Sequence, residues 1–159
     1  MLPGMIELRA LTSDDWKAWR ALRLAALAEA PDAFGSTLAG WQNAPEERWR
    51  DRLSIPGALD LIALHDGDPA GMATGIPDGN GSVEVISVWV DPAARGAGVG
   101  DALLAEIARW ATGSGAAVVR LAVRRDNGPA IRLYERAGFV HAGQSPDDPS
   151  EILMTRAVG

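Results

Sequence analysis

The hydrophobic pattern of the chain predicts short strands separated by turns and helices. Residues 5–10 alternate apolar and polar side chains, as a strand with one buried face does. Later runs rich in Val, Ile and Leu are bounded by Gly, Pro, Asp and Asn, the residues that punctuate strands. These runs predict further strands over residues 59–65, 70–76, 82–90, 117–123, 139–142 and 151–156.

Helical signals fall between these strands. Thr12 or Ser13 is the expected N-cap of the first helix, and the segment 31–45 is expected to be an irregular loop. The predicted helices cover residues 13–29, 45–53, 99–111 and 127–137. Hairpins come first and a strand–helix–strand unit follows. This order predicts an α/β fold, a mixed (α+β) sheet of about six to seven strands flanked by about four helices. Because no linker interrupts the pattern, residues 1–159 are expected to form a single domain.

Composition narrows the function. The 159 residues carry a net charge of −6, which argues against a nucleic-acid partner because such binding depends on cationic side chains. Absence of Cys excludes disulfides, thiolate metal sites and a cysteine nucleophile, and the two His lack metal-ligand spacing, so no metal is expected. No apolar run is long enough to span a membrane. The start of the chain lacks the features of a signal peptide, so a cytoplasmic location is expected.

A glycine cluster lies where the strand 82–90 ends and the next helix begins. The segment Arg95-Gly96-Ala97-Gly98-Val99-Gly100 can bring backbone amides and a helix N-terminus close to an anion. Asp101 follows, where a Walker loop needs Lys and a dinucleotide loop needs Gly, so neither of those phosphate loops fits. A turn used only for tight packing is the structural alternative.

Two motifs together resemble the GCN5-related N-acetyltransferase (GNAT) family. The pattern Arg95-x-x-Gly98-x-Gly100 is similar to the acetyl-CoA pyrophosphate loop of this family. The segment 127–139 matches a second cofactor motif with the pattern Asn, Ala, Tyr and Gly-Phe. Residues 6–9 and 14–16 are also similar, so the resemblance covers nearly the whole chain and implies the GNAT fold, with the cofactor between two parting parallel strands.

The resemblance implies roles for individual residues. Tyr134 becomes the general acid that protonates the departing CoA thiolate, and the backbone amide of Val88 becomes the donor to the thioester oxygen. Glu84 becomes the general base, with a solvated strand-edge charge as the alternative. Simple alternation places Glu84 on the same face of the strand as Val88 and Val90. Acetyl-CoA is the implied co-substrate, with predicted contacts from Val88, Trp89, Val90, Arg95, Gly96, Ala97, Gly98, Val99, Gly100, Asn127, Ala130 and Tyr134.

The acceptor is expected to be a primary amine of a small molecule or peptide. Phe34 and Trp41 from the loop 31–45, together with Glu84, are the expected acceptor-site residues. Without Cys, and without the Gly-x-Ser-x-Gly nucleophile elbow, direct transfer in a ternary complex is favoured over a covalent acetyl-enzyme. A non-catalytic acyl-CoA sensor and a transferase using another acyl-CoA or a hydroxyl acceptor stay open. The resemblance is compatible with a homodimer.

Overall fold

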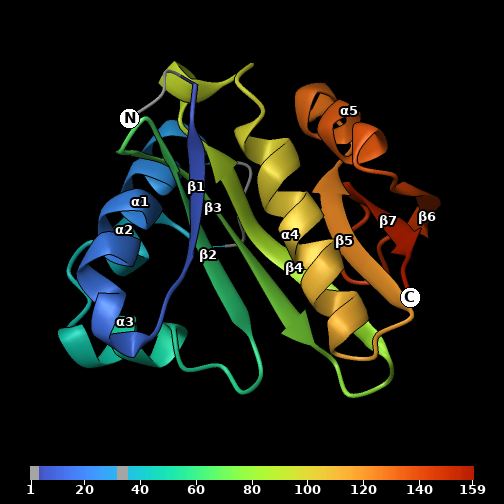
Figure 1. Cartoon of the computed structure of the whole chain (residues 1–159), viewed down its shortest axis with the longest axis horizontal. Coiled ribbons are helices and arrows are strands. Elements are labelled where there is room, and N and C mark those ends of the chain that lie inside the picture. Colours follow the sequence, from blue (N-terminus) through green and yellow to red (C-terminus); the bar gives the residue numbers. More distant parts are fainter. Residues whose placement is uncertain (1–3, 32–35) are drawn as a thin grey trace.

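A seven-stranded mixed sheet forms the centre of the protein (Figure 1). The computed structural model describes residues 4–31 and 36–159. The strands lie in the order β1-β2-β3-β4-β5-β7-β6, and every neighbouring pair except β4 and β5 is antiparallel. Their bounds are β1 Ile6–Ala10, β2 Leu59–His65, β3 Asp68–Pro77, β4 Ser82–Val90, β5 Val118–Arg124, β6 Val140–Gln144 and β7 Glu151–Ala157.

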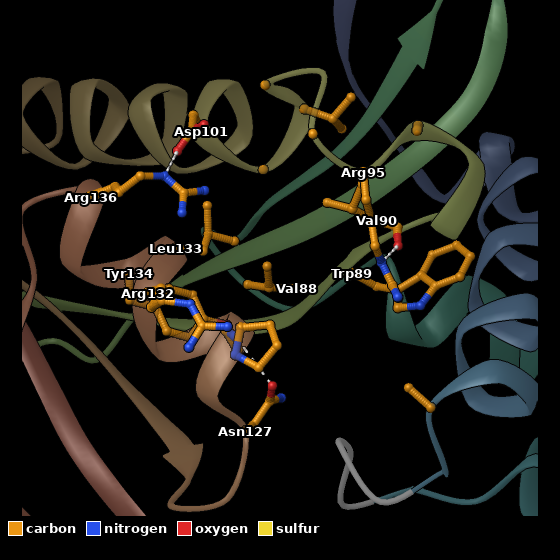
Figure 2. Close-up of a pocket in the computed structure, with 18 of the residues that line it drawn as sticks. Val88, Trp89, Val90, Arg95, Asp101, Asn127, Arg132, Leu133, Tyr134 and Arg136 are labelled. Atoms are coloured by element: carbon orange, nitrogen blue, oxygen red, sulfur yellow. Dashed lines mark hydrogen bonds and ion pairs between the residues drawn. The ribbon is translucent and has the colours of Figure 1, made fainter.

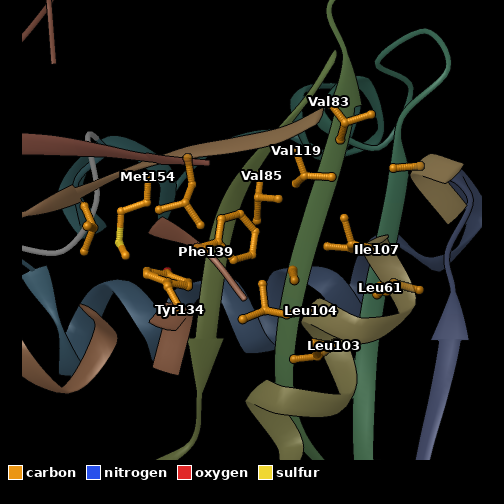
Figure 3. Packing of buried hydrophobic residues seen from close by; sticks show 14 of the residues in the cluster. Leu61, Val83, Val85, Leu103, Leu104, Ile107, Val119, Tyr134, Phe139 and Met154 are labelled. Atoms are coloured by element: carbon orange, nitrogen blue, oxygen red, sulfur yellow. The ribbon is translucent and has the colours of Figure 1, made fainter. Parts of the chain in front are cut away.

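Helices cover both faces of this sheet. The helix α4 packs on β2, β3 and β4 through a stripe that includes Val99, Leu103 and Ile107, while α1 and α3 bury Trp19 and Trp49 against the opposite face. Figure 3 shows the α4 side of the core, where aliphatic side chains from the strands meet those of α4. The helix bounds are α1 Trp16–Glu29, α2 Leu38–Trp41, α3 Glu46–Arg52, α4 Val99–Gly113 and α5 Gly128–Arg136.

The strands β4 and β5 are parallel and pair only at one end. Their register joins Ser82–Glu84 to residues 118–120, and no pairing continues beyond Glu84. In Figure 1 the C-terminal ends of the two arrows lie apart. The edge of β4 beyond Glu84 therefore faces a gap instead of a neighbouring strand. Backbone donors and acceptors on such an edge can bind an extended ligand.

A β-bulge interrupts β4 and changes which side chains share a face. Met72 pairs with Trp89 and Thr74 with Ile86, so two residues of β4 oppose the single residue between them on β3. Val85 lies in the α4-side core before the bulge, and Val88 packs against that same core after it. The predicted alternation is therefore wrong: Glu84 faces the side opposite to Val88.

Most predicted elements are confirmed, with small shifts at their ends. Of the two predicted N-caps, Thr12 and Ser13, the structure has Thr12, which caps the first helical turn through a reciprocal pair of hydrogen bonds with Asp15. The predicted loop 31–45 instead contains the one-turn helix α2, which Thr37 caps by accepting a hydrogen bond from Gly40. A single turn carries too little periodicity for the sequence pattern to indicate it.

Two glycine substitutions test how closely α4 packs on the sheet. A Cβ at Gly71 would lie 2.8 Å from the backbone oxygen of Trp89 on β4 and 3.1 Å from the side chain of Val99 on α4, whereas one at Gly113 would meet no atom within 4 Å. We expect Gly71→Ala to lower the free energy of unfolding by about 1–3 kcal/mol through overpacking. We expect Gly113→Ala to raise it by up to about 1 kcal/mol through helix propensity. Urea unfolding measures both changes, and equal effects of the two substitutions would contradict this packing.

Candidate active site

A pocket opens where β4 and β5 have parted. Its volume is about 780 Å³, and it wraps around the C-terminal end of β4 between α1, the start of α4 and α5 (Figure 2). Because it reaches both faces of β4, its walls include Val88 and Val90 from one face and Trp89 from the other. The remaining lining residues are Glu29, Ala30, Ala94, Arg95, Gly96, Gly98, Val99, Gly100, Asp101, Asn127, Pro129, Ala130, Arg132, Leu133, Tyr134 and Arg136.

The predicted glycine loop forms one end of this pocket. Gly96 and Gly98 have φ values of 85° and 89°, which L side chains rarely adopt, so glycine is required at both. A Cβ at Gly100 would lie 2.9 Å from the side chain of Leu133, so its absence lets α4 approach α5. The helix α4 begins at Val99, and the amides of a first helical turn have no partner within the helix. This end of the pocket is suited to an anion.

A carboxylate that the sequence did not indicate joins α1 to this loop. Glu29 accepts hydrogen bonds from the indole of Trp89 at 2.9 Å and from the guanidinium of Arg95 at 3.0 and 3.1 Å. These donors, the indole foremost, lower the pKa of Glu29. Arg95 also donates to the backbone oxygen of Val90 at 3.1 Å. The Arg95 side chain is therefore held on the pocket wall, with part of its charge balanced by Glu29.

The helix α5 supplies the opposite wall. The side-chain oxygen of Asn127 accepts a hydrogen bond from the amide of Ala130 at 3.2 Å and so caps the helix, as an Asn at this position often does. Ala130 and Tyr134 follow one turn apart on the pocket side. Burial raises the pKa of Tyr134 above its ordinary value of 10.0. The phenol is protonated at neutral pH, as an ordinary tyrosine also is, and is available as a donor.

Cationic side chains of α5 lie at the rim of the pocket. Arg132 and Arg136 are exposed lining residues, and Arg136 pairs with Asp101 at the start of α4 over 3.5 Å. Their spacing of four places both on one side of α5. The sequence pattern did not single them out, because an exposed Arg on an amphipathic helix is ordinary. Their position next to the glycine loop adds positive charge to the anion-binding end.

Some predicted site residues lie away from this pocket. The carboxylate of Glu84 accepts a hydrogen bond from Arg120 on β5 at 2.8 Å, at the end of β4 where the two strands still pair. Glu84 therefore lies beside a cation and not beside Val88 and Val90, with which simple alternation grouped it. Ala97 belongs to the loop but does not line the pocket. Trp41 packs on Trp49, with 4.8 Å between ring centres. Phe34 lies outside the described residues.

Comparison with known proteins identifies the class of protein to which this pocket belongs, with its glycine-rich loop on one side and its buried tyrosine on the other. The model of the acetyltransferase (GNAT) family matches residues 11–139. The chain belongs to the GNAT family of acetyltransferases, which confirms the family and the fold expected from the two motifs.

Solved structures share the fold. The putative acetyltransferase yncA from Salmonella typhimurium, crystallised with acetyl-CoA, superposes with a TM-score of 0.77 at 21% identity and covers 98% of this chain and 95% of its own. The N-acetyltransferase PaiA from Thermoplasma acidophilum, in complex with coenzyme A, superposes with a TM-score of 0.76 at 20% identity and covers 96% and 99%.

Curated relatives are longer than this chain. Mycothiol acetyltransferases from Acidothermus cellulolyticus and Clavibacter sepedonicus are 35% and 36% identical over 89% and 87% of the chain, but over only 47% and 44% of their own lengths. The chain thus spans about half the length of the curated relatives it matches.

In the described residues no helix could cross a membrane, and no group of three His, Asp or Glu could hold a metal ion.

The contacts of Glu29 predict an acid-dependent contribution to stability. Its pKa in the folded protein lies below the ordinary 4.5, so the contribution is present above that pH and is lost as the pH falls through the folded value. Glu29→Gln is expected to lower the free energy of unfolding by about 0.5–1 kcal/mol near neutral pH. The difference from the wild type should shrink as the pH falls below 4.5 and Glu29 becomes protonated. Urea unfolding across this range measures it, and a difference that does not change with pH would refute the assignment.

Proposed function

We propose that this protein transfers an acetyl group from acetyl-CoA to a primary amine of a small molecule or peptide. The observation that carries the proposal is the pocket itself, which joins the free edge of β4, the glycine loop and Tyr134 in one continuous space. The CoA-bound relatives of the same fold support this choice of co-substrate.

The residues present fit acetyl-CoA along its length. The amides of the loop from Arg95 to Gly100 would hold the pyrophosphate at the N-terminus of α4, with Arg132 and Arg136 adding positive charge nearby. The free edge of β4 at Val88 and Val90 would pair with the amide groups of the pantetheine arm, with Trp89 completing that wall. On the other side, the small side chain of Ala130 leaves room for the arm beside Asn127.

Two groups would act on the reacting thioester. The backbone amide of Val88 would donate a hydrogen bond to its oxygen, where negative charge develops during attack. Tyr134 lies across the pocket in the α4-side core, and its phenol would donate a proton to the sulfur as the thiolate leaves. The phenol carries its proton at neutral pH, as a proton donor must.

Glu84 is the proposed base. An alkyl ammonium with a pKa of about 10.4 must lose a proton before it can attack. The bulge places Glu84 on the opposite face of β4 from Val88, away from Tyr134. Base and acid would thus act from opposite sides of the sheet, the base through water because its carboxylate lies outside the pocket.

The step balances without a covalent enzyme intermediate. The amine nitrogen bonds to the thioester carbon, the carbon–sulfur bond breaks, and the products are an amide and the CoA thiol. Glu84 receives the ammonium proton, and Tyr134 supplies the thiol proton. The second proton, which the nitrogen loses as the amide forms, returns to Tyr134 through solvent, and Glu84 releases its proton to solvent, so that one proton is released per turnover. Since the chain has no Cys, direct attack is the simplest route.

A screen of acceptors tests the proposal directly. The purified protein is incubated with acetyl-CoA and a panel of amines, amino acids, amino-terminal peptides and mycothiol precursors. Mycothiol precursors are included because the relatives at 35% and 36% identity are named mycothiol acetyltransferases. We expect thiol release that depends on at least one amine, with the matching acetylated product in the mass spectrum. Tight binding of CoA with no release for any acceptor would contradict the proposal and favour a sensor. Faster release from another acyl-CoA, or with a hydroxyl acceptor, would assign those substrates instead.

Two substitutions test the acid and the base once an acceptor is known. Tyr134→Phe keeps the ring beside Phe139 and should lower kcat by about 10²-fold, with little change in KM for acetyl-CoA. Glu84→Gln should lower kcat/KM by about 10²-fold at neutral pH. The activity of this variant should recover as the pH approaches the pKa of the acceptor ammonium, because the acceptor then loses its proton to solvent without a base. Glu135→Gln on the exposed side of α5 is the charge-matched control. Unchanged turnover in both variants would remove both roles.

A further inference from the structure

A buried polar cluster lies under the bulge of β4, on the face opposite α4. Arg52, at the end of α3, donates to Asp60 on β2 at 3.0 Å and to Thr74 on β3 at 3.1 Å. The same guanidinium donates to the hydroxyl of Ser87 at 3.1 Å, and Thr74 donates to Asp60 at 2.7 Å. Asp60 and Thr74 are 3% and 0% exposed, so this cluster belongs to the interior.

Such a cluster is a costly way to fill a core. Removing two charges from water costs several kcal/mol each, and apolar side chains of the same size often stabilise a fold as well or better (about 1–4 kcal/mol). Trp19, Trp49 and Met72 fill the same face of the sheet. The buried guanidinium of Arg23 lies close enough for the charge of Arg52 to lower its pKa, which adds to the cost of the cluster. Stability alone therefore gives a weak account of Arg52. Among the contacts of Arg52, the one with Ser87 on β4 leads to the proposed active site.

Ser87 holds a strained backbone conformation. Its φ is 58°, in the left-handed region that residues other than glycine rarely adopt, at a cost of about 1–3 kcal/mol. Ser87 is one of the two residues that make the bulge, and Val88 is the other. The conformation of Ser87 thus sets the direction of the peptide group that joins it to Val88, and that group carries the Val88 amide.

We propose that Arg52 is a positioning residue that holds Ser87 in its left-handed conformation and so aims the Val88 amide at the thioester oxygen. The inference rests on the proposed function, because it assigns Arg52 to the same transfer step. Arg52 does not line the pocket and acts only through Ser87. Asp60 and Thr74 orient the guanidinium, so that three neighbouring elements, α3, β2 and β3, together fix the bulge.

Substitutions at Ser87 separate this role from simple stability. Ser87→Ala loses the hydrogen bond to Arg52 but keeps a Cβ that disfavours positive φ, so the bulge should relax. Ser87→Gly loses the same bond but adopts positive φ with little cost. We expect Ser87→Ala to lower kcat by about tenfold with KM for acetyl-CoA within about twofold, and Ser87→Gly to stay within about threefold of the wild type. Ser54→Ala, which removes an exposed hydroxyl beside Arg52, is the matched control and should leave kcat unchanged.

A rescue experiment tests Arg52 itself. Arg52→Met is made together with Asp60→Asn, because Asp60 without its partner would leave a buried charge uncompensated. This pair should lower kcat by about tenfold, and adding Ser87→Gly should restore most of it. A merely structural role predicts a lower folded fraction, unchanged kcat per folded molecule and no rescue by glycine. That result, or equal kcat for Ser87→Ala and Ser87→Gly, would overturn the inference.

Crystal structures provide a readout that does not need an acceptor. In Ser87→Ala and in Arg52→Met/Asp60→Asn, residue 87 should leave the left-handed region and the register between Ile86 and Trp89 should change. In Ser87→Gly the left-handed conformation of residue 87 and the register between Ile86 and Trp89 should both remain. If the wild type transfers no acetyl group but these changes occur, the proposed function fails and the control of the bulge by Arg52 stands. If Ser87→Ala and Arg52→Met/Asp60→Asn keep the bulge of the wild type, the positioning role is wrong whatever the activity.

Discussion

The short parallel pairing between β4 and β5 is the constraint on which the site depends. Both strands are long enough to pair along most of their lengths, yet they do so only over Ser82–Glu84. Each unpaired backbone group beyond that point needs another partner, because buried polar groups are expensive to leave unsatisfied. The gap therefore leaves backbone donors and acceptors in the middle of the sheet that an extended polar ligand can satisfy. The glycine loop and α5 stand at its two sides, so the position of the pocket follows from where the pairing stops.

The backbone performs most of the proposed work in this site. Phosphates would meet amides of the loop and of the first turn of α4, the pantetheine arm would meet the edge of β4, and the thioester oxygen would meet one amide. Side chains with charge play supporting parts, as Arg95 does when Glu29 holds it to the wall. This division explains how a chain with a net charge of −6 can present an anion site, since helix dipoles and amides need no excess of cations.

Sequence patterns predicted the strands, the main helices and the two motifs because each depends on local periodicity or on neighbouring glycines. Strand 82–90 was predicted with its observed bounds, and Tyr134 and the glycine loop do meet in one pocket. The face of Glu84 was predicted wrongly because one inserted residue reverses the alternation, and a serine with positive φ leaves no mark in the sequence. Glu29 and Arg52 were missed because their partners are distant along the chain, at Trp89, Arg95 and Ser87.

Hydrogen exchange of the backbone amides, with and without saturating CoA, tests the central claim that the free edge of β4 binds the co-substrate. Amides that form new hydrogen bonds exchange more slowly. The account predicts added protection for the amides of Val88 and Val90 in β4 and for the loop 95–100, with none for the amides of β4 over residues 82–84, which lie where β4 is already paired with β5. Binding of CoA that leaves the amides of Val88 and Val90 as exposed to exchange as before would contradict it.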